Sequence, residues 1–547
     1  MENNKFHLKR LKFFGFITTI FFVLLGVRLY YLQVYKYPTF SELALKQRSK
    51  EVMLYPKRGI IFDRNLAPLT NIDITPTIIL PKDLINKDKD IYYQVLNNTT
   101  LTYGEFYKMI NSNDYLLQIP LSKDIIIEDK ASSIFFANII NRYKSGNLLS
   151  HVIGYINKAE NTGEAGLEKV YDEFLRNNDK KSLMVEYDKS RSIILGGSEY
   201  VNEISDPNNP AGVKVTIDEN IQTIVEAIMD EKKINGAVVV AEVKTGKLLS
   251  LASRPNFNQD EIQKYIYNNN MALYNKAIQV GYPPGSIFKI VVLLAALEEE
   301  NDFINNEYYC PGYEDIGNVR IKCTGIHGAI NLEEAFAKSC NAAFIQVGKK
   351  IGGYKIIELA KRLNLGEKIN IGLLEEIGGN LPEGDDLLGA AIGNISIGQG
   401  KIEVTPLQVT NLLMIIANNG IQKHLTLIEG ITNKDGKILK EFNKEDDKQL
   451  ISSEIANITY DYLISVVKNG TGKTIDINNI GGAGGKTGSA EAILNKSPTI
   501  HGWFTGFFPE KDPKYVITVL IEEGYSGSKS AAPIFEEICK EINKIYP

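Results

Sequence analysis

The sequence predicts an α+β protein in which helices flank an antiparallel sheet, preceded by a β-rich domain and one transmembrane helix. An uncharged apolar stretch follows a basic N-terminus, and residues 206–212, rich in proline and asparagine, mark a break in composition. After this break, strand patterns near both ends of the remaining chain enclose a long, mostly helical middle. We therefore expect the two ends to meet in one sheet, an α/β sandwich with helices on its faces.

The composition fits a folded protein of more than one domain. Of the 547 residues, 44% are hydrophobic and 23% are charged, and the length exceeds that of one ordinary domain. The net charge of -5 provides no basic surface for nucleic acid, which excludes that class of partner. Four cysteines are too few for a disulfide scaffold.

Residues 1–12 predict a cytoplasmic tail and residues 13–34 a transmembrane anchor. The uncharged run Phe13–Val27 is continued by Leu29–Val34, and together they supply about 22 residues, enough to cross a bilayer once. Basic residues ahead of the span favour a single pass with the N-terminus inside the cytoplasmic membrane and the rest of the chain outside. A cleaved signal peptide is the alternative, but no small-x-small cleavage site follows the span.

The break in composition divides the rest of the chain into two predicted domains. Residues 35–210 are predicted to form a β-rich domain. Because they offer neither a nucleophile–base pair nor the spacing of metal ligands, this domain is interpreted as a structural platform. Residues 211–547 predict the functional domain. Its expected elements are a strand at Val213–Ile217, a helix capped by Asp218, a hairpin of Ala237–Val243 and Leu248–Ser253, strands at Gly502–Phe508 and Tyr515–Ile521, and a helix at Pro533–Ile545.

The stretch Pro283–Lys289 predicts a nucleophile and its base. The Pro-Pro-Gly turn leads into an apolar pattern at helical spacing, which places Ser286 in the first turn of a helix. Unpaired N–H groups and the helix dipole stabilise negative charge that develops there on an attacked carbonyl. Lys289 follows three residues later on the same face, close enough to take the serine proton if burial lowers the pKa of its amine.

Two further polar motifs give the Ser286 pair its meaning. Ser339-Cys340-Asn341 follows a helical run, and Gly485–Ser489 approaches a strand. In this order, Ser-x-x-Lys, Ser-x-Asn and Lys-Thr-Gly form the motif set of penicillin-binding proteins and β-lactamases. Single copies are weak signals: Ser526–Lys529 predicts a solvated loop and Lys244-Thr245-Gly246 a hairpin turn. A phosphate-binding P-loop is excluded, because its first glycine is missing.

The chain resembles the class B penicillin-binding proteins, the membrane-anchored D,D-transpeptidases of the bacterial cell wall, over almost its whole length. No segment resembles the glycosyltransferase domain that marks class A. The resemblance implies a transpeptidase domain of the penicillin-binding and β-lactamase fold on a pedestal of the dimerisation type. Besides the three motifs it rests on Arg58-Gly59, Asp63-Arg64-Asn65, Gly166-Leu167-Glu168, Thr245-Gly246, Ser253-Arg254-Pro255, Gly398-Gln399-Gly400, Thr405-Pro406-Leu407-Gln408 and Trp503-Phe504-Thr505-Gly506.

The resemblance implies catalytic roles for five residues. Ser286 would attack the penultimate D-Ala carbonyl of a peptidoglycan stem peptide, with Lys289 as its base. Ser339 would relay a proton to the leaving amine, and Asn341 would orient Lys289 and bind the substrate amide. Lys486 would supply a positive charge behind the site.

The resemblance also implies a substrate-binding strand and a set of partners. Thr487, Gly488 and Ser489 would bind the substrate, with Thr487 on its terminal carboxylate and the Ser286 and Ser489 N–H groups as oxyanion hole. β-Lactam antibiotics would be caught as stalled acyl-enzymes. A polytopic membrane glycosyltransferase is the expected protein partner. Alternatives are a β-lactamase or β-lactam sensor of the same fold, and a scaffold for that glycosyltransferase.

One cluster lies outside these motifs. Cys310, Asp315, Cys323 and His327 fall in a loop-rich stretch before Ser339, with spacing close to that of zinc ligands. They predict a structural Zn²⁺ that would hold the Ser339 segment in place, since serine acylation itself requires no cofactor. A Cys310–Cys323 disulfide and two reduced, packed thiols are the other interpretations. Cys340, whose side chain is expected to point away from the catalytic residues, is taken as a core thiol and a lesser candidate ligand.

Overall fold

The computed structural model describes most of the chain, as two compact units. The described residues are 2–54, 58–123, 134–158, 160–176, 180–187, 193–203, 211–267, 270–299, 302–442, 446–494 and 497–547. The first unit is Met1–Pro56, Ile74–Asn141 and Asp179–Ile204, and the second is Lys57–Asp73, Arg142–Asn178 and Ser205–Pro547. These units differ from the predicted division into 35–210 and 211–547, because two segments before residue 210 pack with the second unit.

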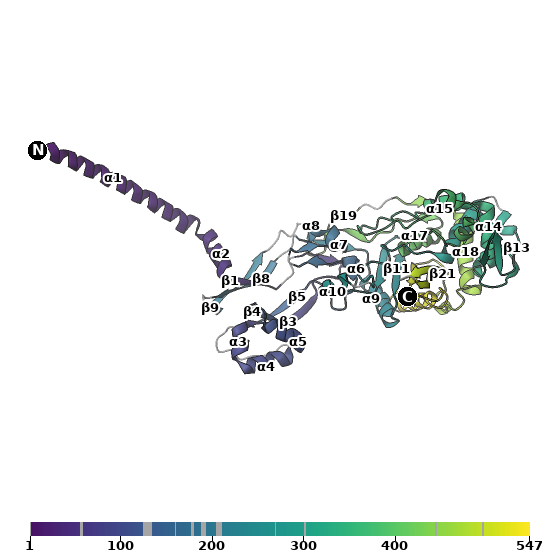
Figure 1. Ribbon diagram of the computed structural model, residues 1–547, viewed down its shortest axis with the longest axis horizontal. Coiled ribbons are helices and arrows are strands. Elements are labelled where there is room, and N and C mark those ends of the chain that lie inside the picture. Colours follow the sequence, from purple (N-terminus) through teal and green to yellow (C-terminus); the bar gives the residue numbers. More distant parts are fainter. Residues whose placement is uncertain are drawn as a thin grey trace. The chain divides into compact units, whose positions relative to one another are not determined.

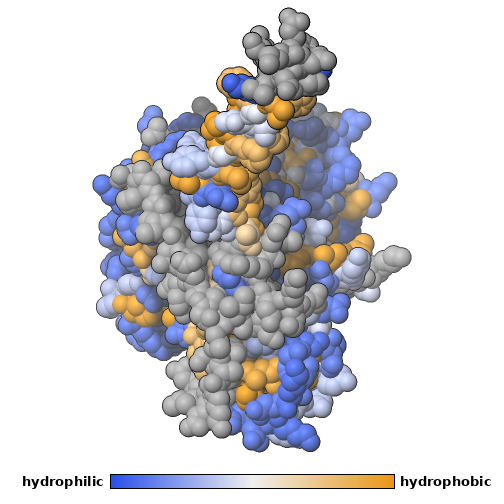
Figure 2. Space-filling view, turned by 90° about the vertical axis from the view of Figure 1, so that its left-hand side faces the viewer, coloured by the Kyte–Doolittle hydropathy of each residue, from blue (hydrophilic) through white to orange (hydrophobic). Residues whose placement is uncertain are grey.

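The first unit begins with the apolar helix. Helix α1 (Glu2–Tyr30) continues as a π-helical turn at Tyr31–Tyr35. Its span Arg10–Tyr35 has a mean hydropathy of 1.9, and among the described residues it is the one helix long and apolar enough to cross a membrane. Figure 2 shows hydrophobic side chains exposed along it. This helix fits a single-pass anchor and contains the predicted span 13–34.

The rest of the first unit contains helices as well as the predicted strands. One sheet has the order β1-β8-β9 and a second the order β4-β3-β5. Apolar residues of the second sheet, such as Ile78, form a core with Val95 and Phe106 of the helices beside it. The elements are α2 (Tyr37–Arg48), β1 (Ser49–Met53), β3 (Asp73–Pro81), α3 (Lys82–Lys87), α4 (Lys89–Asn98), α5 (Tyr103–Ile110), β4 (Leu116–Pro120), β5 (Phe135–Asn141), β8 (Lys180–Tyr187) and β9 (Ile193–Glu203).

The second unit is built on a five-stranded antiparallel sheet with the order β12-β11-β23-β22-β21. Two of these strands, β11 and β21, are labelled in Figure 1. The sheet joins strands from near the two ends of residues 211–547, as the sequence predicts. Strand β21 carries the Lys-Thr-Gly motif and lies at one edge. The strands are β11 (Gly236–Glu242), β12 (Leu248–Arg254), β21 (Gly484–Leu494), β22 (Ser497–Phe508) and β23 (Tyr515–Ile521).

Helices cover both faces of this sheet. Successive side chains of each strand point to opposite faces, so apolar residues of one strand contribute to both cores. Val238 of β11 packs in one core with α9 and α19, whereas Val239 packs in the other with α11 and α17. The predicted cap of α9 is confirmed, since the Asp218 carboxylate accepts hydrogen bonds from the backbone of the first turn. These helices are α9 (Glu219–Glu231), α11 (Lys289–Glu298), α17 (Pro406–Ala417), α18 (Ser453–Asn469) and α19 (Ala531–Ile545).

The predicted strand at Val213–Ile217 forms β10 (Gly212–Val215), but it belongs to a separate sheet with the order β19-β18-β10-β2. Strand β2 (Ile60–Phe62) pairs with β10 in parallel, and this pairing attaches Lys57–Asp73 to the second unit. The remaining elements of this sheet are β18 (Ile428–Thr432) and β19 (Ile438–Glu441).

A buried ion network joins the two early segments of the second unit. The Glu168 carboxylate accepts hydrogen bonds from Arg58 Nε at 2.8 Å and from Arg142 Nε at 2.7 Å. Arg58 also pairs with Asp172 at 2.8 Å. Because Glu168 is fully buried, these two guanidinium groups offset the cost of removing its carboxylate from water. This network accounts for the Arg58 and Gly166-Leu167-Glu168 motifs, which therefore have a structural role.

The second unit also contains shorter elements, five of them before Asn178 and the others between β12 and β21. These shorter elements are α6 (Ser150–Ile153), β6 (Ile156–Asn157), β7 (Thr162–Gly163), α7 (Gly166–Val170), α8 (Asp172–Leu175), α10 (Gln263–Ile266), α12 (Asp302–Asn305), β13 (Tyr308–Cys310), β14 (Tyr313–Ile316), β15 (Val319–Lys322), β16 (Gly328–Ile330), α13 (Leu332–Ala337), α14 (Asn341–Ile351), α15 (Gly353–Arg362), α16 (Ala391–Ser396), β17 (Ile421–Gln422) and β20 (Lys448–Gln449).

Candidate active site

Ser286 lies in a tight turn that leads into α11. The turn Gly285–Phe288 is a 3-10 helix, a small departure from the predicted α-helical turn. Gly285 has φ +52°, and a Cβ added there would lie 2.5 Å from the Ser489 carbonyl oxygen, so the position requires glycine. The Trp503 indole N–H donates to the Pro283 carbonyl at 3.1 Å. Packing and hydrogen bonds on both sides thus fix the position of Ser286.

Lys289 is completely buried one turn after Ser286. Its Nζ donates to the Ser339 carbonyl at 2.7 Å, to Ser339 Oγ at 3.3 Å and to Asn341 Oδ1 at 2.8 Å. Burial lowers the pKa of Lys289 to about 8, although the neighbouring thiols Cys340 and Cys323 act in the opposite direction. About a tenth of the amine is therefore neutral at pH 7 and able to accept a proton.

Ser339-Cys340-Asn341 forms the junction between α13 and α14. Ser339 has φ +54°, a conformation rare for a residue other than glycine, and this turns the chain between the two helices. The Asn341 amide donates to the Lys322 carbonyl at 2.9 Å while its oxygen accepts from Lys289. These two bonds fix which end of the amide faces the lysine.

Lys486 approaches the same serine from β21. Its buried Nζ donates to Ser339 Oγ at 3.1 Å, so this hydroxyl lies between two lysine amines. Burial lowers the pKa of Lys486 well below its ordinary value, and repulsion from Lys289 lowers it further. Thr487, the next residue, shares a hydrogen bond of 2.5 Å with the Thr471 hydroxyl.

The three motifs open on one pocket of about 800 Å³. Its wall includes Ser286, Ser339, Asn341, Thr487 and Ser489. The amines of Lys289 and Lys486 lie buried behind this wall. The structure therefore brings together the predicted catalytic residues, which the sequence places far apart.

Gly488 has a different place from its two neighbours on β21. A Cβ added to it would lie 2.8 Å from Ile287 and 2.9 Å from the Pro284 carbonyl oxygen. This glycine therefore lets the strand pack against the Ser286 turn, whereas Thr487 and Ser489 line the pocket.

The sequence interpretation missed part of the pocket wall. Ser526 and Ser528 line the pocket, and the Gly527 N–H donates to Ser489 Oγ at 3.1 Å. The predicted loop at Ser526–Lys529 thus contributes to the pocket wall, a position that the sequence interpretation did not anticipate. The sequence of a loop of small polar residues does not indicate where the loop lies in the folded protein, because its position depends on the tertiary fold. The hairpin residues Arg320 and Lys322, also in the wall, had no signal either.

Residues 236–540 match the family model described as the penicillin-binding protein transpeptidase domain. This chain belongs to the penicillin-binding proteins. Over 97% of its length it is 29% identical to stage V sporulation protein D of Bacillus subtilis, covering 85% of that protein. It is also 26% identical to the peptidoglycan D,D-transpeptidase MrdA of Acinetobacter baumannii, over 97% of this chain and 88% of that one.

Solved penicillin-binding proteins share the fold. The structure of the penicillin-binding protein PBP2 from Helicobacter pylori superposes with a TM-score of 0.67 at 22% identity, covering 91% of this chain and 99% of that one. With these relatives and its N-terminal apolar helix, the chain is a class B penicillin-binding protein, as the sequence predicts.

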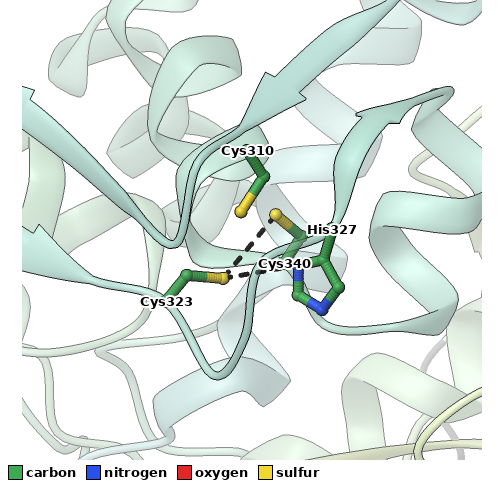
Figure 3. Close-up of side chains that lie close together, drawn as sticks. All are labelled: Cys310, Cys323, His327 and Cys340. Carbon is green, nitrogen blue, oxygen red and sulfur yellow. Dashed lines mark hydrogen bonds between the residues drawn. The ribbon is translucent and has the colours of Figure 1, made fainter.

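Beside the active site lies a cluster of sulfur and nitrogen ligands (Figure 3). The donor atoms of Cys310, Cys323, His327 and Cys340 all lie within 4.8 Å of one another. Cys323 Sγ is 3.7 Å from Cys340 Sγ and 3.6 Å from His327 Nδ1. The four cysteines of the chain are free thiols in the structure, so the alternative Cys310–Cys323 disulfide is not formed.

The predicted ligand set is wrong in one member. Asp315 is not part of the cluster, because it lies on β14 opposite Arg320 of β15 and pairs with its guanidinium at 2.8 and 2.9 Å. Cys340, the lesser candidate, takes its place. Its side chain points away from the pocket, as expected, and this direction leads to the other thiols.

Proposed function

We propose that Ser286 is the acylated nucleophile of a serine D,D-transpeptidase that cross-links the stem peptides of bacterial peptidoglycan. The chain is a penicillin-binding protein with a transpeptidase domain. The observation that supports the assignment of Ser286 is the convergence of three motifs on one pocket, with Ser339 Oγ between two buried lysine amines.

Acylation begins with attack of Ser286 Oγ on the carbonyl of the penultimate D-Ala. The neutral amine of Lys289 accepts the hydroxyl proton, and the N–H groups of Ser286 and Ser489 stabilise the oxyanion. When the tetrahedral intermediate collapses, its C–N bond breaks and Ser339 passes a proton to the leaving nitrogen. D-Ala departs, and the rest of the stem peptide remains as an ester on Ser286.

Transfer repeats these steps with a new nucleophile. An amine from a neighbouring stem peptide attacks the ester carbonyl, loses a proton to the lysine–serine network and forms a peptide bond. Ser286 Oγ leaves and is protonated again, so no cofactor is consumed. The product is a peptide cross-link between the donor and acceptor stem peptides.

Lys486 acquires its charge when substrate binds. Burial and repulsion from Lys289 disfavour protonation of the Lys486 amine. The terminal carboxylate of a stem peptide at Thr487 would bring a negative charge to the same place and favour the protonated amine. Lys486 and Thr487 would then hold the substrate by its terminal carboxylate, a group that an amidated peptide lacks. The carboxylate of a β-lactam would bind in the same way.

The membrane arrangement follows from the anchor. The basic residues that precede the apolar helix support an N-terminus in the cytoplasm and a catalytic unit on the cell-wall side. The anchor and first unit would then be free to bind a polytopic membrane glycosyltransferase that makes the glycan strands. If Ser286→Ala restored growth fully to a strain lacking the protein, the chain would act as a scaffold instead.

The β-lactam adduct tests the assignment. The full chain in detergent is incubated with benzylpenicillin and weighed intact by mass spectrometry. We expect one slowly lost adduct, absent in Ser286→Ala and retained in the matched variant Ser453→Ala, which alters an exposed serine of α18 outside the pocket wall. An adduct that turns over rapidly would identify a β-lactamase, and an adduct in Ser286→Ala would refute the nucleophile.

We also propose that Cys310, Cys323, His327 and Cys340 hold a structural Zn²⁺. A tetrahedral zinc with bonds of about 2.3 Å places its sulfur ligands about 3.8 Å apart, close to the 3.7 Å between Cys323 and Cys340. The Asn341 N–H donates to Cys323 Sγ at 3.2 Å, and Cys340 lies between the two catalytic residues. The metal would therefore brace Ser339 and Asn341 without entering the reaction.

Metal analysis tests this proposal. Protein purified without added metal should contain about one zinc per chain, and Cys323→Ser should lose the zinc and thermal stability. Cys539→Ala, which removes the buried cysteine of α19, should keep the zinc. Zinc-free protein with unchanged stability in Cys323→Ser would refute the proposal, and a thiol count two short of four would identify a disulfide.

A further inference from the structure

Strand β21 offers a row of side chains along the pocket. Thr487, Ser489 and Glu491 are spaced two residues apart, so they share one face of the strand, and all three line the pocket. Because β21 is at the edge of the sheet, an extended peptide can align along it. The chain thus has a track that begins at Thr487 and ends at Glu491.

The proposed function sets the direction and register of a peptide on this track. With its terminal carboxylate at Thr487, the substrate runs antiparallel to β21, and each extended residue advances about 3.3 Å. Its third residue from the C-terminus then lies about 7 Å back, level with Ser489. A long side chain on that third residue therefore reaches Glu491.

Glu491 differs from every other side chain around the pocket. Among the described residues in the wall it is the single acidic one, and it is exposed. No ion pair or hydrogen bond engages its carboxylate within the described parts of the chain. The basic residues of the wall are Arg320, which pairs with Asp315 and lies 3.9 Å from the Tyr313 ring centroid, and Lys322.

We propose that Glu491 selects donor stem peptides in which the third residue is a diamino acid with a free side-chain ammonium. This inference rests on the proposed function, which supplies the register. The carboxylate would pair with the ammonium at the end of the track, while Thr487 binds the opposite end of the peptide. The other role open to Glu491 is to protect an edge strand from pairing with another chain, and that role does not depend on the substrate.

A pair of donor peptides separates the two roles. The full chain is given Nα-acetyl-L-lysyl-D-alanine ending in a D-thiolactate thioester, or the same compound acetylated at Nε, and thiol release is measured. An exposed ion pair is worth up to about fivefold in a rate constant, so wild type should acylate three- to fivefold faster with the free amine. This preference should shrink in high salt.

The variant that tests the inference is Glu491→Gln, with Glu173→Gln as matched control. Glu173 is an exposed carboxylate of α8 outside the pocket wall. The preference ratio should fall to about one in Glu491→Gln and stay unchanged in Glu173→Gln. An unchanged ratio in Glu491→Gln, or equal rates in wild type, would overturn the inference while penicillin adduct formation leaves the proposed function intact. Failure of both thioester and penicillin to acylate Ser286 would instead refute the proposed function, and the inference with it.

Discussion

The pH dependence of Ser286 acylation follows from the burial of Lys289. Burial lowers the pKa of its amine to about 8, whereas the free side chain titrates near 10.5. Acylation requires the neutral amine, so the rate constant should rise with pH and level off above the pKa. The neutral fraction is about 9% at pH 7 and about 91% at pH 9, which predicts a roughly tenfold rise between these values.

The assay is the second-order rate constant for acylation by benzylpenicillin, measured from pH 6 to 10 at constant ionic strength. Lys289→Arg should abolish acylation at every pH, because a guanidinium stays charged. Lys529→Arg, in the other Ser-x-x-Lys sequence, should reproduce the wild-type profile. A rate constant that is flat or falls across this range, or a midpoint near 10.5, would refute the role of Lys289 as a desolvated base.

Three further predictions concern the supports of the site. Glu168→Gln removes the carboxylate that Arg58 and Arg142 share, and Arg58 keeps only its pair with the less buried Asp172, so the free energy of unfolding by denaturant should fall by about 3–5 kcal/mol; a loss as small as that in Glu173→Gln would contradict the network. Gly285→Ala forces a Cβ against a β21 carbonyl, and penicillin acylation should slow at least about tenfold; wild-type kinetics would mean that the turn adapts. Trp503→Phe removes the donor to Pro283 at a cost of about 1 kcal/mol. Its thermal midpoint should drop by about 1 °C, and no drop would show that the bond is dispensable.

Four strands of the five-stranded sheet could be predicted because their signals are local, whereas the convergence of the motifs was implied by the resemblance to a known family. The two strands of the β11–β12 hairpin are joined by a turn sequence, and Asp218 caps the helix before them. The three motifs lie in a 3-10 turn that leads into α11, at the junction between α13 and α14, and on β21. Their order along the chain is enough to identify the fold that brings them together.

Long-range pairings could not be predicted in the same way. The parallel pairing of β2 with β10 joins residues far apart in the sequence, and no turn sequence signals it. The orientation of Asp315 depends on the register of the β14–β15 hairpin, whose strands have four residues each. A shift by one residue reverses the direction of the Asp315 side chain. Cys340 reaches the thiol cluster after the left-handed turn at Ser339, which the sequence does not reveal.

The most direct test of the central claim is transfer of an acyl group from Ser286 to an amine. The full chain is given the lysyl-D-alanyl thioester as donor and a D-amino acid as acceptor, and the products are separated and weighed. We expect the amide of donor and acceptor from wild type and from Ser453→Ala, and none from Ser286→Ala. Hydrolysed donor without any amide, or amide formation by Ser286→Ala, would contradict the account.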